Sequence, residues 1–165
     1  MKTIYFIRHA KSSWDHFGIS DKDRPLNDRG EQDAPRMAQL LKEKGVQPDQ
    51  LVSSPAKRAF TTATYFAKAF DIPVSDIIIK EQIYEANVRD IMEVVREMSD
   101  DWEVVFLFGH NPTFTDVVNQ FAQHSISNVP TCGICKVESQ IAHWEAFDRH
   151  KGQLKGFYYP KQLFI

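Results

Sequence analysis

TIYFIRHA, residues 3–10, is an apolar run that ends abruptly in an arginine and a histidine. A nearly continuous run of this kind is typical of a β-strand that is covered on both faces, like the central strands of a parallel sheet. We therefore expect a strand from about Thr3 to Arg8, with His9 just beyond its end. Ligands of open α/β sheets bind outside the carboxyl ends of the strands, so both side chains are candidates for a functional site.

Two later stretches repeat the arrangement of an apolar run followed by polar side chains. Leu51-Val52 precedes SSPAKR, residues 53–58, and residues 104–108 precede GHNP, residues 109–112. Because the carboxyl ends of parallel strands meet at the same edge of a sheet, side chains that are distant in sequence converge there. The expected cluster contains two arginines and two histidines: Arg8, His9, Arg58 and His110.

Apolar runs alternate with helical patterns along the chain, which predicts a three-layer α/β/α fold with a largely parallel central sheet. Strands are expected at residues 3–8, 51–52, 77–79, 104–108, 134–138 and 141–146. Ser139-Gln140 suits a tight turn between the last two strands, so this edge of the sheet is expected to be antiparallel. The length suits a single domain over residues 1–165.

Four helices are expected between these strands. The first covers residues 28–44, with Asn27 as its N-cap. A second begins at Ser54-Pro55 and a fourth at Asn111-Pro112, each with a polar cap followed by proline at the first helical position. An amphipathic pattern around residues 91–98 predicts the third.

Composition excludes several classes of protein. Hydrophobic residues make up 42% of the chain and charged residues 25%, which is ordinary for a globular protein. The net charge is −2 and no basic run stands out, so we expect no nucleic-acid partner. No apolar stretch approaches the roughly 20 residues of a membrane span, and Arg8 ends the N-terminal run too early for a signal peptide. We expect a cytoplasmic protein with no membrane partner.

CGIC, residues 132–135, holds both cysteines. A redox pair of this spacing belongs at a helix N-terminus, but the residues that follow look like a strand. A structural zinc site needs two further ligands, and neither a second such pair nor a spaced pair of histidines exists. We therefore interpret Cys132 and Cys135 as packing residues at the start of a strand, and expect no metal.

Four motifs in order resemble the histidine phosphatase superfamily, which is phosphoglycerate mutase-like in fold. They are Arg8-His9-Ala10, DRPLN with Arg29-Gly30, Ser53-Ser54-Pro55 with Arg58, and residues 109–112. Within it the chain is most similar to the small SixA-type phosphohistidine phosphatases. The resemblance covers residues 2–133, and the last thirty or so residues carry no motif of the family.

Phosphoryl transfer gives each residue of the cluster a role. Transfer spreads negative charge over three oxygens, which the protein must position and stabilise. Arg8 and Arg58 offer planar forks of donors that match phosphate oxygens, and His110 can donate a further hydrogen bond. His9 is the candidate nucleophile, because a neutral imidazole can form a phosphohistidine intermediate and the arginines favour its neutral form. The resemblance implies the same four assignments. We expect no cofactor, because the two arginines supply the positive charge.

Glu85 is the candidate general acid, because it follows the third expected strand, where the mutases and broad phosphatases of the superfamily carry an acidic residue. The alternative is a carboxylate on a solvated loop. Asp15 stands where the mutases carry an asparagine donor, and it would repel phosphate unless it turns away or pairs with Arg24. We interpret Asp21 and Arg24, together with Asp23, as residues that hold the shape of this loop.

These observations predict a metal-independent phosphatase that works through a phosphohistidine on His9. The expected substrate is phosphohistidine in a phosphorylated protein. A small phosphorylated substrate, a phosphate ester, is the first alternative, and the short chain makes a mutase less favoured. The alternative of another class is a module that binds phosphate or a phosphopeptide without turnover. We expect Trp14 to cover the edge of the core and not to stack on the substrate.

Overall fold

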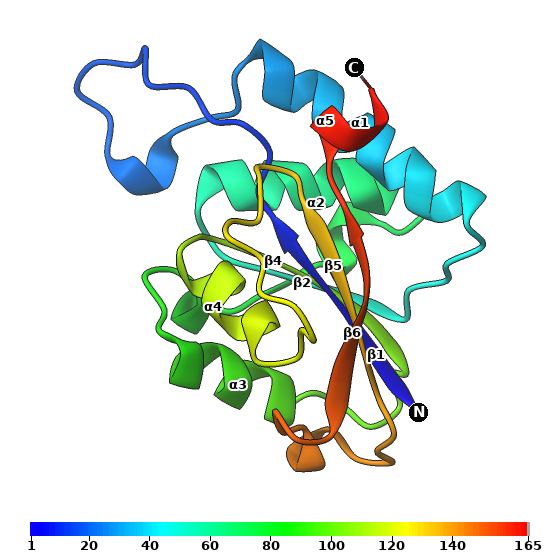
Figure 1. Ribbon diagram of the computed structural model, residues 1–165. Coiled ribbons are helices and arrows are strands. Elements are labelled where there is room, and N and C mark those ends of the chain that lie inside the picture. The colour runs from blue at the N-terminus through cyan, green and yellow to red at the C-terminus, as the bar shows by residue number, and fades with distance from the viewer. Residues whose placement is uncertain (165) are drawn as a thin grey trace.

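The protein is built on one mixed sheet with the strand order β3-β2-β4-β1-β5-β6, in a computed structural model that describes residues 1–164 (Figure 1). The strands are β1 (Lys2–Arg8), β2 (Gln50–Ser53), β3 (Ile78–Ile79), β4 (Val104–Gly109), β5 (Ile134–Ser139) and β6 (Gly152–Tyr158). The first four are parallel, whereas β5 pairs antiparallel with both β1 and β6. The predicted antiparallel edge is confirmed.

Helices cover both faces of this sheet, which confirms the predicted three layers (Figure 1). They are α1 (Asp28–Glu43), α2 (Lys57–Ala69), α3 (Val88–Arg96), α4 (Thr113–Asn119) and the short α5 (Pro160–Leu163). Side chains of α1 and α2 pack on one face, and those of α3 and α4 pack on the other.

Strand β1 lies between β4 and β5 and is buried on both faces, as its apolar run predicts. Tyr5 and Ile7 point into the core beneath α1 and α2, whereas Ile4 and Phe6 point into the core beneath α3 and α4. This division follows from the alternation of side chains along a strand. A strand that serves two cores has little freedom to shift, so it fixes the position of whatever follows Arg8.

The register between β1 and β4 decides where the site lies. Arg8 pairs with Gly109, so the next residue of each strand, His9 and His110, leaves the sheet side by side. Gly109 has no room for a side chain, because a Cβ there would lie 2.4 Å from the ring of Phe114. The glycine therefore lets α4 pack closely against the end of β4.

The prediction of a strand over residues 141–146 is wrong. Residues 144–146 form a 3-10 turn in which Trp144 is fully buried and its indole donates to the carbonyl oxygen of Trp102. The large Trp144 side chain fills the core beneath α3. In a strand, successive side chains would instead have to alternate between the two faces of the sheet. The last strand is β6, so no tight turn forms at Ser139-Gln140.

The predicted starts of two helices are also wrong. Helix α2 begins at Lys57, after Ala56 as N-cap, and Ser54 instead accepts a hydrogen bond from the backbone of Ala56. Helix α4 begins at Thr113, one residue later than predicted, but Asn111 does cap its first turn, because its side-chain oxygen accepts from the N–H of Thr115 at 3.1 Å. The first helix is confirmed as predicted, with the Asn27 side chain accepting from the backbone of Gly30.

Both cysteines are buried and free, in agreement with their interpretation as packing residues. Cys132 precedes β5 and Cys135 lies within it. Burial raises the pKa of Cys135 to about 12 and raises that of Cys132 as well. Both side chains therefore remain thiols at neutral pH.

Gly30 gives a sharp test of how α1 is seated against the loop that follows His9. A Cβ at Gly30 would lie 2.2 Å from the backbone oxygen of Lys11. Alanine in a helix normally stabilises by about 1 kcal/mol over glycine. Here we expect Gly30→Ala to lower the free energy of unfolding by about 1–3 kcal/mol, because the backbone must move to make room. Denaturant unfolding measures this loss.

The matched control is Gln39→Ala, on an exposed position of the same helix. It is expected to leave the free energy of unfolding within about 0.5 kcal/mol of wild type. A Gly30→Ala protein that is as stable as the control would contradict the close approach of α1 to Lys11.

Candidate active site

His9 lies directly beyond the end of β1, and its backbone is held on both sides. Its N–H donates to the carbonyl of Gly109 at 3.1 Å, and its carbonyl accepts from the N–H of Cys132 at 3.0 Å. The side chain is buried, with 7% of the residue exposed. Its Nδ1 lies 2.7 Å from the carbonyl oxygen of Ala10. A carbonyl only accepts, so Nδ1 carries the proton and Nε2 keeps a free lone pair.

Helix α2 anchors the backbone beside His9. The N–H of Ala10 donates to the Thr62 hydroxyl at 3.0 Å, and that hydroxyl donates to the backbone carbonyl of Arg58 at 2.8 Å. Thr62 is fully buried, so neither bond competes with water. Thr62 therefore fixes the segment that carries His9 relative to the turn of helix that carries Arg58. The only sequence signal for this residue is its position four residues after Arg58, on the same face of the helix as Ala59 and Ala63.

His110 faces His9 from the neighbouring strand. The two ring centroids are 5.2 Å apart, and the Tyr84 ring lies 5.7 Å from that of His110 on another side. His110 Nε2 is 2.7 Å from the hydroxyl oxygen of Ser54, which follows β2. Three neighbouring strand ends thus meet at this pair of rings, as the sequence predicts.

The two arginines of the cluster lie on different elements, and both lower the pKa of His9. Arg8 ends β1, and its Nη1 donates to the carbonyl oxygen of Val129 at 2.9 Å. Arg58 is almost fully buried, and its Nη1 and Nη2 donate to the backbone oxygen and the carboxylate of Asp21 at 2.7 and 3.0 Å. Each guanidinium is therefore held by some of its donors while others are left over.

Unpaired polar atoms concentrate at this cluster. Four buried side-chain polar atoms of residues 1–164 have no hydrogen-bond partner, and three of them belong to the cluster. These three are Arg8 Nε, Arg58 Nε and His110 Nδ1. Because a buried polar group without a partner costs stability, such groups are rare in folded proteins unless a ligand satisfies them. The fourth atom, Asp33 Oδ2, lies outside the cluster.

The surroundings keep both histidines neutral. Burial lowers the pKa of His9 to about 3, with further lowering by His110, Arg58 and Arg8, although the bond to the Ala10 carbonyl opposes it. Burial also lowers the pKa of His110 to about 4, with Arg58 adding to the effect and Asp21 opposing it. The sequence assigned this effect on His9 to the arginines, but the larger cause is removal from water.

Asp21 connects the loop after β1 to the cluster. Its carboxylate accepts from the Tyr84 hydroxyl at 2.7 Å, and it pairs with Arg58 and with Arg24 Nε at 3.1 Å. The bond from Tyr84 is the largest cause that lowers the pKa of Asp21 to about 2, and both arginines add to it. Sequence reasoning limited Asp21 to the shape of its loop and missed its contact with Arg58, because the two residues are far apart in sequence.

Glu85 and Asp15, the two carboxylates that the sequence singles out, are both exposed. Glu85 is exposed, has a backbone φ of 56°, and follows Tyr84, whose ring contacts His110. A positive φ is uncommon for a residue with a side chain, so the chain bends sharply here. Asp15 is exposed, and of the two arrangements considered it does not form the pair with Arg24, which bonds instead to Asp21 and to the hydroxyl of Ser12.

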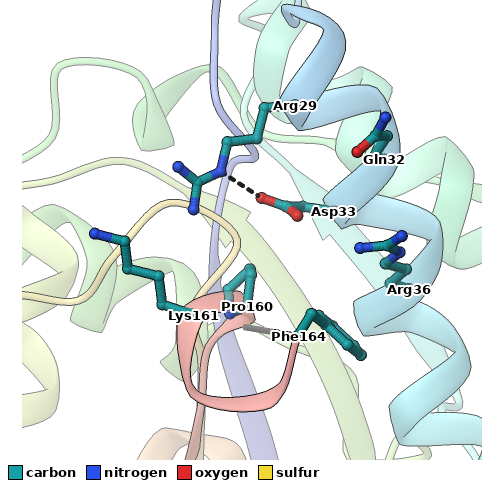
Figure 2. Close-up of a pocket in the computed structure, with 7 residues that line it drawn as sticks. All are labelled: Arg29, Gln32, Asp33, Arg36, Pro160, Lys161 and Phe164. Carbon is teal, nitrogen blue, oxygen red and sulfur yellow. Dashed lines mark ion pairs between the residues drawn. The ribbon is translucent and has the colours of Figure 1, made fainter.

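A separate cavity of about 500 Å³ opens between α1 and α5 (Figure 2). Arg29 Nε lies 3.4 Å from Asp33 Oδ2 on its wall, and Lys161 and Phe164 line the side formed by α5. None of the two arginines and two histidines of the cluster lines this cavity. The cluster lies at the carboxyl edge of the sheet and not in this cavity.

The sheet order and the position of the cluster define an α/β protein of the phosphoglycerate mutase-like class. Residues 4–113 match the profile of the histidine phosphatase superfamily, branch 1. Because this match spans more than half of the chain, the chain belongs to the histidine phosphatase superfamily. Membership supports a phosphatase activity.

Solved structures resemble the chain over nearly its whole length. SixA of Agrobacterium tumefaciens is 26% identical with a TM-score of 0.81, over 96% of this chain and 98% of that one. A protein histidine phosphatase SixA complexed with tungstate is 20% identical with a TM-score of 0.82, over 98% and 99% of the two chains. These likenesses place the fold among SixA-type structures.

Curated relatives include proteins of similar and of larger size. A protein of Mycobacterium leprae is 27% identical over 169 residues, which cover 94% of this chain and 100% of the relative. A 2,3-bisphosphoglycerate-dependent phosphoglycerate mutase of Bifidobacterium longum is 31% identical over 131 residues. This match covers 74% of the present chain but 53% of the mutase.

In residues 1–164, no helix is long and apolar enough to cross a membrane.

Titration of the two histidines tests the electrostatics of the cluster. Free histidine takes up a proton near pH 6.5, whereas His9 and His110 are expected to stay neutral down to about pH 5. In that range the unfolded chain binds more protons than the folded one, so both residues make the protein less stable as the pH falls. The measurement is the imidazole chemical shift of each residue by NMR. Movement of both signals with a midpoint near 6.5 would contradict this account.

Proposed function

We propose that the protein is a phosphatase that passes a phosphoryl group through a covalent phosphohistidine on His9, and that its substrate is phosphohistidine in a protein. One observation carries the proposal. A neutral imidazole with a free Nε2 lies in a cluster where Arg8, Arg58 and His110 each have a buried nitrogen without a partner. Phosphoryl oxygens are acceptors that suit these donors.

In the first step, His9 Nε2 attacks the phosphorus atom. A new N–P bond forms on His9, the bond from phosphorus to the substrate breaks, and its electron pair leaves with the substrate. The charge on the three phosphoryl oxygens is stabilised by Arg8 and Arg58, with His110 as a further donor. The Ala10 carbonyl holds the proton on Nδ1 and so favours the positive charge that develops on the ring.

In the second step, water attacks the phosphorus atom and the N–P bond to His9 breaks. One proton of the water remains with the released phosphate, and the other is taken up by the product that left in the first step. The histidine returns to its neutral state, which its buried position favours. The two steps together consume one water for each phosphoryl group hydrolysed.

No metal or cofactor has a part in this proposal, because two guanidinium groups supply the positive charge. Tungstate and vanadate are expected to inhibit, since each resembles a phosphoryl group in transfer. One of the structures with the same fold is a SixA complexed with tungstate.

Two alternatives remain beside phosphohistidine. The match to a phosphoglycerate mutase favours a small phosphate ester, although the chain spans about half of that relative. A module that binds phosphate without turnover would also use the unpaired donors, but it has no need for a neutral histidine with a free Nε2. Turnover of a generic aryl phosphate separates an enzyme from a binding module.

His9→Ala tests the nucleophile. Removing a group that forms a covalent intermediate is expected to lower kcat by several orders of magnitude, roughly 10³-fold or more. The assay follows release of phosphate from an aryl phosphate, with and without excess chelator, and wild type is expected to give equal rates in both. Circular dichroism checks that the variant is folded. A folded His9→Ala protein with near-normal rates would rule out the nucleophile, and dependence on an added divalent ion would rule out the metal-free site.

Glu85→Gln tests the general acid and the substrate class together. The imidazole of phosphohistidine is a comparatively good leaving group, whereas an alkoxide needs a proton. We therefore expect the variant to cleave phosphohistidine nearly as well as wild type, but to lose about 10²–10⁴-fold on an alkyl phosphate. The measurement compares kcat on the two substrates.

Equal losses on both substrates would contradict a general-acid role for Glu85. If wild-type protein turns over one alkyl phosphate rapidly and cleaves no phosphohistidine, the substrate is a small ester. Glu145→Gln is the matched control, because Glu145 is exposed in the 3-10 turn at residues 144–146, which bonds to Trp102 before the start of β4 and so lies at the end of the sheet opposite the cluster.

A further inference from the structure

Residues 14–19, in the loop between β1 and α1, expose three large apolar side chains. The exposed fraction is 75% for Trp14 and 43% for Ile19, and Phe17 is essentially fully exposed. Eight large apolar residues are exposed among residues 1–164, so three of them lie within six consecutive positions. Single exposed apolar residues are ordinary in soluble proteins, but a group of this kind marks a surface that meets a partner.

The base of this loop is fixed, while its tip is free. Ser12 and Ser13 are buried directly after the nucleophile segment, and the Ser13 N–H donates to the carbonyl of Pro25 at 2.8 Å. Ser12 also forms an antiparallel bridge with Leu26. Between these anchors the chain extends beyond the carboxyl end of β1, where Gly18, with a φ of 84°, turns it back (Figure 1). The tip that carries Phe17 is therefore open to solvent.

A chain of contacts joins this loop to an arginine of the cluster. The Arg24 guanidinium lies 3.6 Å from the centroid of the Trp14 ring, and the same side chain pairs with Asp21 at 3.1 Å. Asp21 in turn pairs with Arg58 at 3.0 Å. Trp14 thus stacks on Arg24 instead of covering the core edge, which corrects the sequence-based prediction. A partner that binds this loop therefore contacts residues that are linked to Arg58 through Arg24 and Asp21.

We propose that residues 14–19 are the docking surface for the polypeptide that carries the phosphohistidine, and that they bind apolar side chains next to it. This proposal rests on the proposed function. A phosphorylated protein that delivers its phosphoryl group to His9 must also lie over the loops around the cluster, whereas a small ester occupies only the cluster. The loop mixes both signs of charge, with Lys11, Asp15 and Lys22 along it, so apolar contact and not charge selects the occupant.

Two phosphohistidine peptides test this proposal, one with leucines flanking the phosphohistidine and one with serines. Wild-type protein is expected to have a kcat/KM about tenfold higher for the leucine peptide, because burying an apolar side chain has an effect of this size. Phe17→Ser and Ile19→Ser are expected to remove this preference by raising KM. Both variants are expected to turn over p-nitrophenyl phosphate at the wild-type rate, because neither side chain reaches the cluster.

Val74→Ser is the matched control, since Val74 is also exposed but precedes β3. It therefore lies toward the amino ends of the parallel strands, whereas the cluster lies at their carboxyl ends. It is expected to keep the preference for leucine. Equal kcat/KM values for the two peptides in wild type would overturn the docking surface, as would a preference that survives in both loop variants. If wild type hydrolyses p-nitrophenyl phosphate but neither peptide, phosphohistidine is not the substrate, and the docking proposal falls together with that substrate.

Discussion

The pairing of β1 with β4 is the constraint on which the rest of the structure depends. Arg8 opposite Gly109 sets His9 beside His110, and Ser53 opposite Phe108 brings Ser54 within hydrogen-bond distance of His110. A shift of the register by one residue would turn β1 over and exchange the two cores that it fills. Packing of the two cores therefore holds the two histidines together.

Burial then gives this cluster its chemical character. Removal from water keeps His9 and His110 neutral, while the two guanidinium groups keep their charge. The result is an uncharged imidazole with a free lone pair among positive donors, which is the combination that transfer of a phosphoryl group from an anionic substrate requires. The contacts from Trp14 through Arg24 and Asp21 to Arg58 connect the cluster to the exposed loop at residues 14–19.

Sequence alone predicts the centre of the protein better than its edges. The apolar runs of β1 and β4 are unambiguous because these strands are buried on both faces, and the residues that follow them then converge by topology. The strand β6 was missed because it lies at the edge of the sheet, and its glycines and lysine hide the pattern. Thr62 and Asp21 act through contacts with distant segments, which no local pattern reports.

The central claim is that the phosphoryl group resides covalently on His9 during turnover. The most direct test is to mix the protein with a phosphorylated substrate, quench with alkali in the steady state, and locate the phosphoryl group by mass spectrometry and ³¹P NMR. We expect one phosphoryl group on His9, bonded to Nε2, because Nδ1 is engaged with the Ala10 carbonyl. A phosphoryl group on another residue, or turnover with no phosphoenzyme at any time, would contradict it.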